Sequence, residues 1–304
     1  MSQPIIAPSY IRSALPAEWD VFELDERGTP DSAALESVRF YVRSYDAVPR
    51  EGELIARMPK LDVVQTLTAG VDDVLPYVPS DVTLCNAAGV HDASTAELAI
   101  GLMISAQRNL HGYRDLQHQG TWDMRWQRGL ADAHVVIIGA GHIATAIANR
   151  LIPMEATFTR VARSARTDAL GPVHAMSDLP QLLPTADIVC LIVPLTPDTK
   201  RLVDAEFLSR MKDDALLVNV ARGKVVDTDA LVIALQSGRL RAAVDVTDPE
   251  PLPQDHPMWT APNVIITPHI GGHARAFLPR AQHLVKSQIQ RWLDGQPLEN
   301  VIAH

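Results

Sequence analysis

The segment VVIIGAGHIATAIANRL, residues 135–151, restricts the fold more than any other part of the chain. Four aliphatic residues lead directly into Gly139, and apolar side chains then return at helical spacing at Ile143, Ile147 and Leu151. A strand that is apolar on both faces is typical of a parallel sheet covered by helices on each side. The segment therefore predicts a buried strand, a tight turn and a helix within an α/β domain.

The glycine spacing inside this segment indicates a ligand. Gly139 permits the tight turn, Gly141 leaves room for a pyrophosphate, and the small Ala144 lets the helix approach the strand. The helix start adds free N–H groups and a partial positive charge. A structural turn would explain the glycines, but a dinucleotide-binding loop also explains the strand and the helix around them. We therefore predict that Gly139, Gly141, His142 and Ile143 contact a dinucleotide.

Short β-branched runs alternate with amphipathic stretches along the rest of the chain, which is the pattern of parallel sheets. The chain has 304 residues, of which 47% are hydrophobic, so two domains with separate cores are expected. A long helix is expected over 92–109, and another within roughly the last thirty residues. Strands are predicted at 4–7, 38–42, 63–67 and 82–85 in a first sheet, and at 134–138, 187–193, 215–220, 241–246 and 263–267 in a second.

Composition argues against several classes of function. The formal net charge of −9, without an extended basic face, argues against nucleic-acid binding. Cys85 and Cys190 stand far apart in apolar runs and are expected as buried core thiols, not as a disulfide or metal site. The chain has neither an HEXXH motif nor an acid-rich calcium loop, so no metal is expected. The start, MSQPIIAPSY, lacks a charged leader, and no long apolar run follows, so a cytoplasmic protein without a membrane span is expected.

Three further motifs each follow the end of a predicted strand: NVARG at 219–223, DVTDPEP at 245–251 and TPHIGG at 267–272. In an open parallel sheet the carboxyl ends of the strands line the ligand crevice, so Arg222, Glu250 and His269 are expected to converge there. Taken singly, each is an ordinary surface or packing residue. Together they supply a two-pronged anion clamp, a carboxylate and a proton donor, which is the equipment for reducing a carbonyl group.

The chain resembles the D-isomer-specific 2-hydroxyacid dehydrogenases. The resemblance rests on an ordered set of motifs, namely TAGVD at 68–72, GAGHIA at 139–144, VPLTPDT at 193–199, NVARG, DVTDPEP and TPHIGG. It implies a Rossmann nucleotide-binding domain, residues 89–272, inserted into a flavodoxin-like substrate domain made of 1–88 and a C-terminal helix in 273–304. It also implies a homodimer that reduces a small 2-oxoacid to the D-2-hydroxyacid, and the reverse, with NAD(P)H.

The resemblance assigns roles to individual residues. Arg222 would bind the substrate carboxylate and carbonyl, Glu250 would pair with the histidine, and His269 would act as the acid/base. The backbone amides around Ala69 and Gly70 would hold the substrate carboxylate. The substrate itself stays open among glyoxylate, hydroxypyruvate and larger oxoacids. The remaining cofactor positions are Pro194 and Thr199 along the adenosine side, Ala221, and Asp245 near the nicotinamide amide.

Two other functions use a similar glycine loop. A dinucleotide-sensing binding protein, or a corepressor-like module on the same fold, would keep the dehydrogenase residues. We read no long appended tail or basic docking segment in the chain, which favours the enzyme. A methyltransferase with an adenosyl cofactor would leave Arg222, Glu250 and His269 unexplained.

The stretch TRVARSAR, residues 159–166, bears on the choice of cofactor. In an NAD site an acidic residue about 20 positions beyond the first glycine meets the ribose 2′-hydroxyl, and this chain has none between Glu155 and Asp168. Since alternate strand residues point to opposite faces, not all the arginines can reach one ligand, and an exposed loop of solubilising arginines is the alternative. We predict that Arg160, Arg163 and Ser164 bind the 2′-phosphate of NADP, with NAD as the second cofactor.

Trp122 and Trp126 stand four residues apart in a polar loop. This spacing would place both side chains on one face of a helix. Packing within the chain is the favoured interpretation, and closure over the substrate is the alternative.

Overall fold

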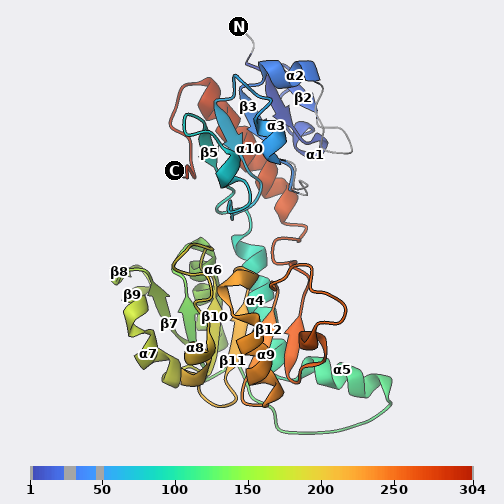
Figure 1. The fold of residues 1–304 in the computed structure, drawn as a ribbon, viewed down its shortest axis with the longest axis vertical. Helices are drawn as coiled ribbons and strands as arrows, with labels where there is room; N and C mark the ends of the chain where they lie inside the picture. The colour runs from blue at the N-terminus through green and yellow to red at the C-terminus, as the bar shows by residue number, and fades with distance from the viewer. Residues whose placement is uncertain (1–2, 24–31, 46–50, 303–304) are drawn as a thin grey trace. The chain divides into compact units, whose positions relative to one another are not determined.

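The computed structural model describes residues 3–23, 32–45 and 51–302, and these form two compact units (Figure 1). The first unit consists of Met1–His91 together with Ala274–His304, and the second is Asp92–His273. The chain therefore leaves the first unit once and returns to it near its end. The domain boundaries expected from the sequence, after residues 88 and 272, lie close to these two crossings.

The first unit contains a 5-stranded sheet in the order β2-β1-β3-β4-β5. All neighbouring strands in it run parallel, and the order is that of flavodoxin. The edge strand β2 was not predicted, because its side chains are not uniformly apolar or buried. The elements are β1 (Ile5–Ala7), α1 (Ser9–Arg12), β2 (Val21–Glu23), α2 (Ser32–Ser37), β3 (Phe40–Val42), α3 (Glu51–Ile55), β4 (Val63–Gln65), η1 (Leu75–Tyr77), β5 (Thr83–Cys85) and α10 (Phe277–Leu293).

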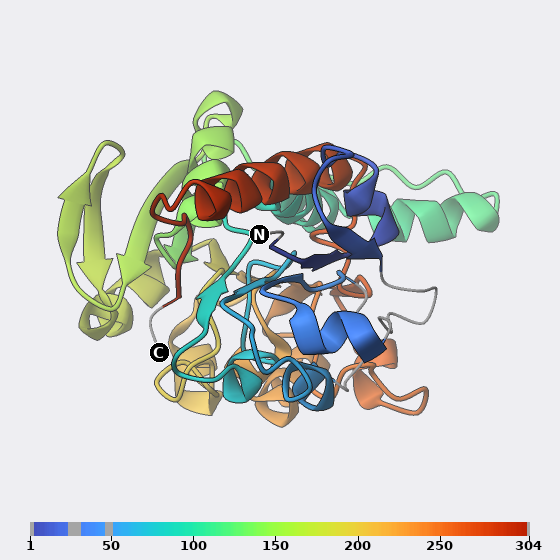
Figure 2. The same ribbon diagram turned by 90° about the horizontal axis from the view of Figure 1, so that it is seen from above.

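Alternation along these strands builds two cores, one on each face of the sheet. Ile5 and Phe40 face α1 and α10, and α10 runs along that side of the sheet in Figure 2. Ile6 and Tyr41 face α2 and α3 on the other side. The last helix of the chain therefore completes the sheet formed by the first residues.

The second unit contains an 8-stranded sheet in the order β13-β12-β11-β10-β6-β7-β9-β8. Its strands run parallel except β8, which pairs antiparallel with β9 at one edge (Figure 1). From β9 to β12 the order is that of the Rossmann fold. The prediction of two open parallel-sheet domains is confirmed, although β8 and β9 were not expected. The strands are β6 (His134–Ile138), β7 (Thr157–Ala162), β8 (Arg166–Asp168), β9 (Gly171–Ala175), β10 (Ile188–Leu191), β11 (Leu216–Asn219), β12 (Arg241–Val244) and β13 (Val264–Ile266).

Helices cover both faces of this second sheet. Val135 and Ile137 pack against α4 and α6, whereas Val136 and Ile138 pack against α7, α8 and α9. The helices are α4 (Asp92–Gln107), α5 (Leu110–His118), α6 (His142–Leu151), α7 (Leu179–Leu182), α8 (Ala205–Arg210) and α9 (Thr228–Gln236), with short 3-10 turns at η2 (Ile152–Met154), η3 (Met176–Asp178), η4 (Leu183–Thr185), η5 (Gly223–Val225) and η6 (Pro257–Thr260).

Both cysteines are free and buried, as predicted. Burial raises the pKa of the Cys190 thiol to about 12 and that of Cys85 to about 11. Across the described ranges, no helix has both the length and the apolar character needed to cross a bilayer. The same residues contain no cluster of three or more side chains suited to holding a metal ion.

Candidate active site

The glycine loop between β6 and α6 has the geometry of an anion site. Gly139 has a φ of 128°, and a Cβ there would lie 2.5 Å from the carbonyl oxygen of Ile192, so other residues are excluded. A Cβ at Gly141, the residue that precedes α6, would meet nothing within 4 Å. His142 is exposed and Ile143 is half-buried at the helix start. The loop therefore leaves open space in front of a helix N-terminus, where a pyrophosphate would be stabilised.

Arg160 does not face that space. Its side chain is 1% exposed, and its Nη1 and Nη2 atoms donate to the Asp168 carboxylate at 2.8 and 2.6 Å. Nη2 also donates to the Gly171 carbonyl oxygen at 3.1 Å. The prediction that Arg160 contacts the 2′-phosphate is therefore wrong. The physical reason is the β8–β9 hairpin, which brings the exposed Asp168 carboxylate onto the buried Arg160 guanidinium, a partner that the sequence did not reveal.

The last four residues of the stretch 159–166, from Arg163 to Arg166, are exposed. Arg163 and Ser164 follow the end of β7 directly. Arg166, at the start of β8, donates from Nη2 to the carbonyl oxygen of Ala140 at 2.9 Å, and Ala140 stands between the two glycines of the loop. Arg166 is not among the 2′-phosphate contacts predicted from the sequence. Its contact with the loop is set by the hairpin, for which the sequence offered no clear signal.

The three motifs NVARG, DVTDPEP and TPHIGG all lie in the second unit, at the ends of its strands. His269 follows β13 and Glu250 follows β12, and the distance from His269 Nδ1 to Glu250 Oε1 is 2.6 Å. This hydrogen bond raises the pKa of His269, against the opposing effects of burial and of the Arg222 charge. Burial opposes ionisation of Glu250, but the His269 contact and the Arg222 charge lower its pKa below the usual value. The site thus favours an imidazolium paired with a carboxylate, beside a guanidinium.

Asp245 holds the backbone that carries His269. The His269 φ is 54°, and its amide donates to the Asp245 carbonyl oxygen at 2.7 Å. The buried Asp245 carboxylate accepts hydrogen bonds from Thr267 Oγ1 at 2.6 Å and from the amides of Ile270 and Gly271 at 2.8 Å. Besides the cofactor role expected for it, Asp245 therefore fixes the TPHIGG loop.

The NVARG loop is held in a comparable way. Asn219 Oδ1 accepts from the Ala221 amide at 3.0 Å, and Asn219 Nδ2 donates to the Arg222 carbonyl oxygen at 3.1 Å. A Cβ on Gly223 would lie 1.8 Å from the Thr247 carbonyl oxygen, so the loop packs directly on the DVTDPEP segment. Asn219 and Gly223 are positioning residues that the sequence analysis did not name. Because both residues belong to the NVARG motif that contains Arg222, the sequence could have indicated their role.

Hydrogen bonds to backbone carbonyl oxygens shape both the VPLTPDT loop and the TAGVD loop. Thr199 is buried, and its hydroxyl donates to the Pro194 carbonyl oxygen at 2.6 Å, so it shapes the loop. In the first unit, Asn86 donates to the Ala69 carbonyl oxygen at 2.8 Å and Thr68 to that of Gly70 at 2.7 Å. No residue that the structure describes accepts a hydrogen bond from the amide of Ala69 or Gly70.

Residues 100–271 match the sequence model of the D-isomer specific 2-hydroxyacid dehydrogenase, NAD binding domain. This chain belongs to that dehydrogenase family. The resemblance inferred from the motifs is thereby confirmed, and the second unit contains the matched region.

Two curated members of the dehydrogenase family are similar over most of this chain. The D-3-phosphoglycerate dehydrogenase of Methanocaldococcus jannaschii is 34% identical over 279 residues, which is 86% of this chain but only 51% of that enzyme. The human glyoxylate reductase/hydroxypyruvate reductase is 33% identical over 257 residues, 78% of this chain and 76% of that enzyme. The chain thus spans about half the length of the first relative. Since the two relatives differ in named substrate, family membership does not identify the substrate.

A solved structure of the dehydrogenase family matches almost the whole chain. It is the NADPH-dependent glyoxylate/hydroxypyruvate reductase of Sinorhizobium meliloti, in complex with NADP and sulfate. The TM-score is 0.85 at 26% identity, and the match covers 99% of this chain and 98% of that one.

Trp122 and Trp126 do not pack within the described chain. Their exposed fractions are 96% and 103%, and Met124 between them is 90% exposed. Residues 121–129 form no helix, so the helical spacing assumed for the two tryptophans is wrong. The favoured interpretation of intrachain packing is therefore wrong as well.

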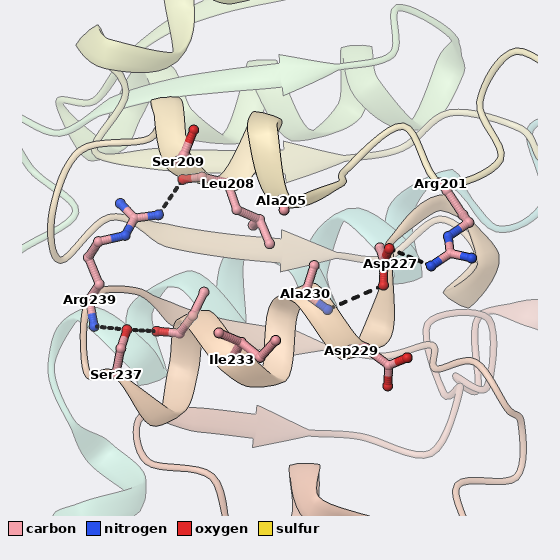
Figure 3. A pocket seen from close by; sticks show the side chains of 11 residues that line it. Arg201, Ala205, Leu208, Ser209, Asp227, Asp229, Ala230, Ile233, Ser237 and Arg239 are labelled. Carbon is pink, nitrogen blue, oxygen red and sulfur yellow. Dashed lines mark hydrogen bonds and ion pairs between the residues drawn. The ribbon is translucent and has the colours of Figure 1, made fainter.

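A pocket of about 460 Å³ between α8 and α9 contains none of the site residues (Figure 3). Arg201 at one end pairs with Asp227, which also accepts from the Ala230 amide at 3.2 Å. Arg239 at the other end donates to the Leu208 carbonyl oxygen. These charged groups stabilise the ends of the two helices, and we assign the pocket no part in the reaction.

Proposed function

We propose that this dehydrogenase-family protein reduces a small 2-oxoacid to the D-2-hydroxyacid, and catalyses the reverse, with NADP as preferred cofactor and NAD as the second. The observation that carries the proposal is the 2.6 Å hydrogen bond between His269 and Glu250, next to the charge of Arg222. A protonated imidazole held by a carboxylate can donate a proton to a developing alkoxide. Glyoxylate and hydroxypyruvate head the substrates to test, because the human and Sinorhizobium relatives are named for them.

In this mechanism, the bound reduced nicotinamide supplies the hydride. Negative charge develops on the keto oxygen, where the Arg222 guanidinium stabilises it and His269 donates its proton. Since Nδ1 of His269 bonds Glu250, Nε2 is the atom left for the substrate. Such acid/base catalysis contributes roughly 10²–10⁴-fold. The substrate carboxylate is assigned to the amides of Ala69 and Gly70, because their carbonyl oxygens, but not these N–H groups, take part in described hydrogen bonds.

The choice of NADP rests on the end of β7. Arg163 and Ser164 are exposed there, at the place where an NAD enzyme carries an acidic residue. The Sinorhizobium relative is described as NADPH-dependent. The open space at Gly141 accommodates a pyrophosphate in either cofactor.

The test is to follow NADPH and NADH absorbance with a panel of 2-oxoacids and to analyse the chirality of the product. The expected result is oxidation of NADPH in preference to NADH with at least one oxoacid, giving the D-product. Tight cofactor binding without turnover on any oxoacid would support the dinucleotide-sensing alternative instead.

We also propose that the protein is a homodimer whose contact surface includes Trp122, Met124 and Trp126, since large apolar side chains seldom stay in water. Sedimentation should show a dimer that Trp126→Ser weakens. Ile233→Ser, which removes an exposed apolar side chain from α9, is the control and should leave the mass unchanged. A parent protein that sediments as a monomer would contradict the dimer.

A further inference from the structure

The outer strand of the edge hairpin in the second unit, β8, has no apolar support of its own. The three residues of β8 are all exposed, and this strand pairs only with β9 among the described strands. Arg160 on β7 and Arg166 on β8 both lie opposite Val173 of β9, one on each side. Val173 of β9 is buried, but β8 lies beyond β9 at the edge of the sheet, so burial of its own side chains does not hold it.

A charged group reaches across β9 to supply that support. The Arg160 guanidinium makes two hydrogen bonds to Asp168 at the end of β8 and a third to the Gly171 carbonyl oxygen. Asp168 also accepts from the Leu170 amide at 2.9 Å, within the turn of the hairpin. Two-pronged guanidinium–carboxylate contacts fix orientation as well as distance. The ion pair thus ties both strands of the hairpin to β7.

The other end of β8 carries Arg166, which contacts the glycine loop. One of its five N–H donors is used on the Ala140 carbonyl oxygen, and the side chain is exposed. In a dinucleotide fold the pyrophosphate lies at this loop and the adenosine ribose at the end of the second strand, here β7. The Arg166 charge is therefore held beside the loop, on the side of the molecule where Arg163 and Ser164 stand.

We propose that Arg166 is a further contact for the 2′-phosphate, and that Arg160 and Asp168 are positioning residues that hold it there through the β8–β9 hairpin. The inference rests on the proposed use of NADP and goes beyond it, because it assigns cofactor specificity to an ion pair between the buried Arg160 and the exposed Asp168, neither of which is proposed to touch the cofactor. It also explains how an acidic residue can stand near an anion site, since Arg160 neutralises it and holds the pKa of Asp168 at about 2.

Asp168→Asn distinguishes positioning from simple charge. If Asp168 acted only as a nearby negative charge, its removal should tighten NADPH binding. If it positions Arg166, the KM for NADPH should rise roughly tenfold, the loss of one charge-assisted hydrogen bond, while the KM for NADH changes by less than about twofold. Asp168→Glu keeps the carboxylate and should restore part of the affinity. Calorimetry with adenosine 2′,5′-bisphosphate and with AMP gives a readout independent of turnover, and only the bisphosphate should weaken.

Arg166→Ala should produce the same selective loss of NADPH affinity. In the double variant, Asp168→Asn should add little to this loss, because both changes remove the same contact between Arg166 and the 2′-phosphate. Glu206→Gln is the matched control, since it also removes one carboxylate charge and one arginine partner, Arg210 at 2.7 Å, but on α8. It should leave both KM values unchanged.

Three outcomes for Asp168→Asn would overturn the positioning role: tighter binding of NADPH, unchanged binding of NADPH, or an equal loss of affinity for NADPH and NADH. An equal loss would indicate that the residue affects the pyrophosphate, which both cofactors share. If Asp168→Asn does not fold, Arg166→Ala decides the contact, and unchanged bisphosphate binding in that variant rejects it. The two proposals fail differently. A parent enzyme that prefers NADH refutes the NADP proposal, whereas selective loss in Arg163→Ala without any in Arg166→Ala or Asp168→Asn refutes only this inference.

Discussion

His269 Nδ1 and Glu250 Oε1 lie 2.6 Å apart, and their hydrogen bond shifts the two pKa values in opposite directions. The imidazole keeps its proton to higher pH, and the carboxylate stays ionised to lower pH. The two groups come from the ends of adjacent strands, β12 and β13. The pair is thus poised to donate a proton from the histidine while the glutamate remains charged.

Glu250→Gln should move the pH profile of reduction. Reduction needs protonated His269, so activity falls as pH rises through the pKa of that histidine. Because Glu250 raises this pKa, its loss should shift the falling limb of kcat/KM to lower pH. Oxidation needs neutral His269, so its rising limb should shift to lower pH as well. Profiles that coincide with those of the parent in both directions would remove Glu250 from the mechanism.

His269→Ala should reduce kcat for reduction by roughly 10²–10⁴-fold, because the proton donor is lost. The dissociation constant of NADPH, measured by fluorescence titration, should stay near the parent value. A variant that keeps most of its turnover would show that another group donates the proton.

Arg222→Lys should lower kcat/KM for the oxoacid by well over tenfold, since lysine keeps the charge but not the planar fork. Arg201→Lys, at a surface ion pair with Asp227, is the control and should leave the kinetics unchanged. Near-parental kinetics for Arg222→Lys would mean that the residue acts only through its long-range field.

Gly223→Ala should disturb the Arg222 loop, because the added Cβ would overlap the Thr247 carbonyl oxygen at 1.8 Å. Both Tm and kcat/KM should fall, and the melting curve and steady-state kinetics measure this. Gly101→Ala in α4 is the matched control. A Cβ there meets nothing within 4 Å, and the helix should gain up to about 1 kcal/mol of stability. Equal behaviour of the two variants would argue against tight packing at Gly223.

The preference for NADPH over NADH should diminish as salt is added, because Arg163 is exposed and its attraction to a 2′-phosphate is screened. Arg163→Ala should weaken NADPH more than NADH. The measurement is the ratio of the two KM values at low and high ionic strength. A ratio that is independent of salt would contradict an electrostatic origin of the preference.

The sequence was sufficient for features that depend on local geometry and on strand order. The turn at Gly139 requires a positive φ, and the apolar run before it requires a covered sheet, so both can be recognised without knowing the fold. The meeting of Glu250 and His269 with Arg222 follows because parallel strands end at one edge. The family could be identified because the motifs occur in a fixed order along the chain.

Only the tertiary structure decided what each arginine of 159–166 does. Arg160, Arg163 and Arg166 have the same chemistry, but the β8–β9 hairpin buries the first against Asp168 and directs the third to Ala140. The hairpin is held by side-chain and backbone contacts that cannot be predicted from the periodicity of apolar residues. In the same way, the exposure of Trp122 and Trp126 depends on what surrounds them rather than on their spacing. Periodicity indicates which face of an element is apolar, whereas the partner of a charged or aromatic side chain is set by how separate elements pack against one another in the fold.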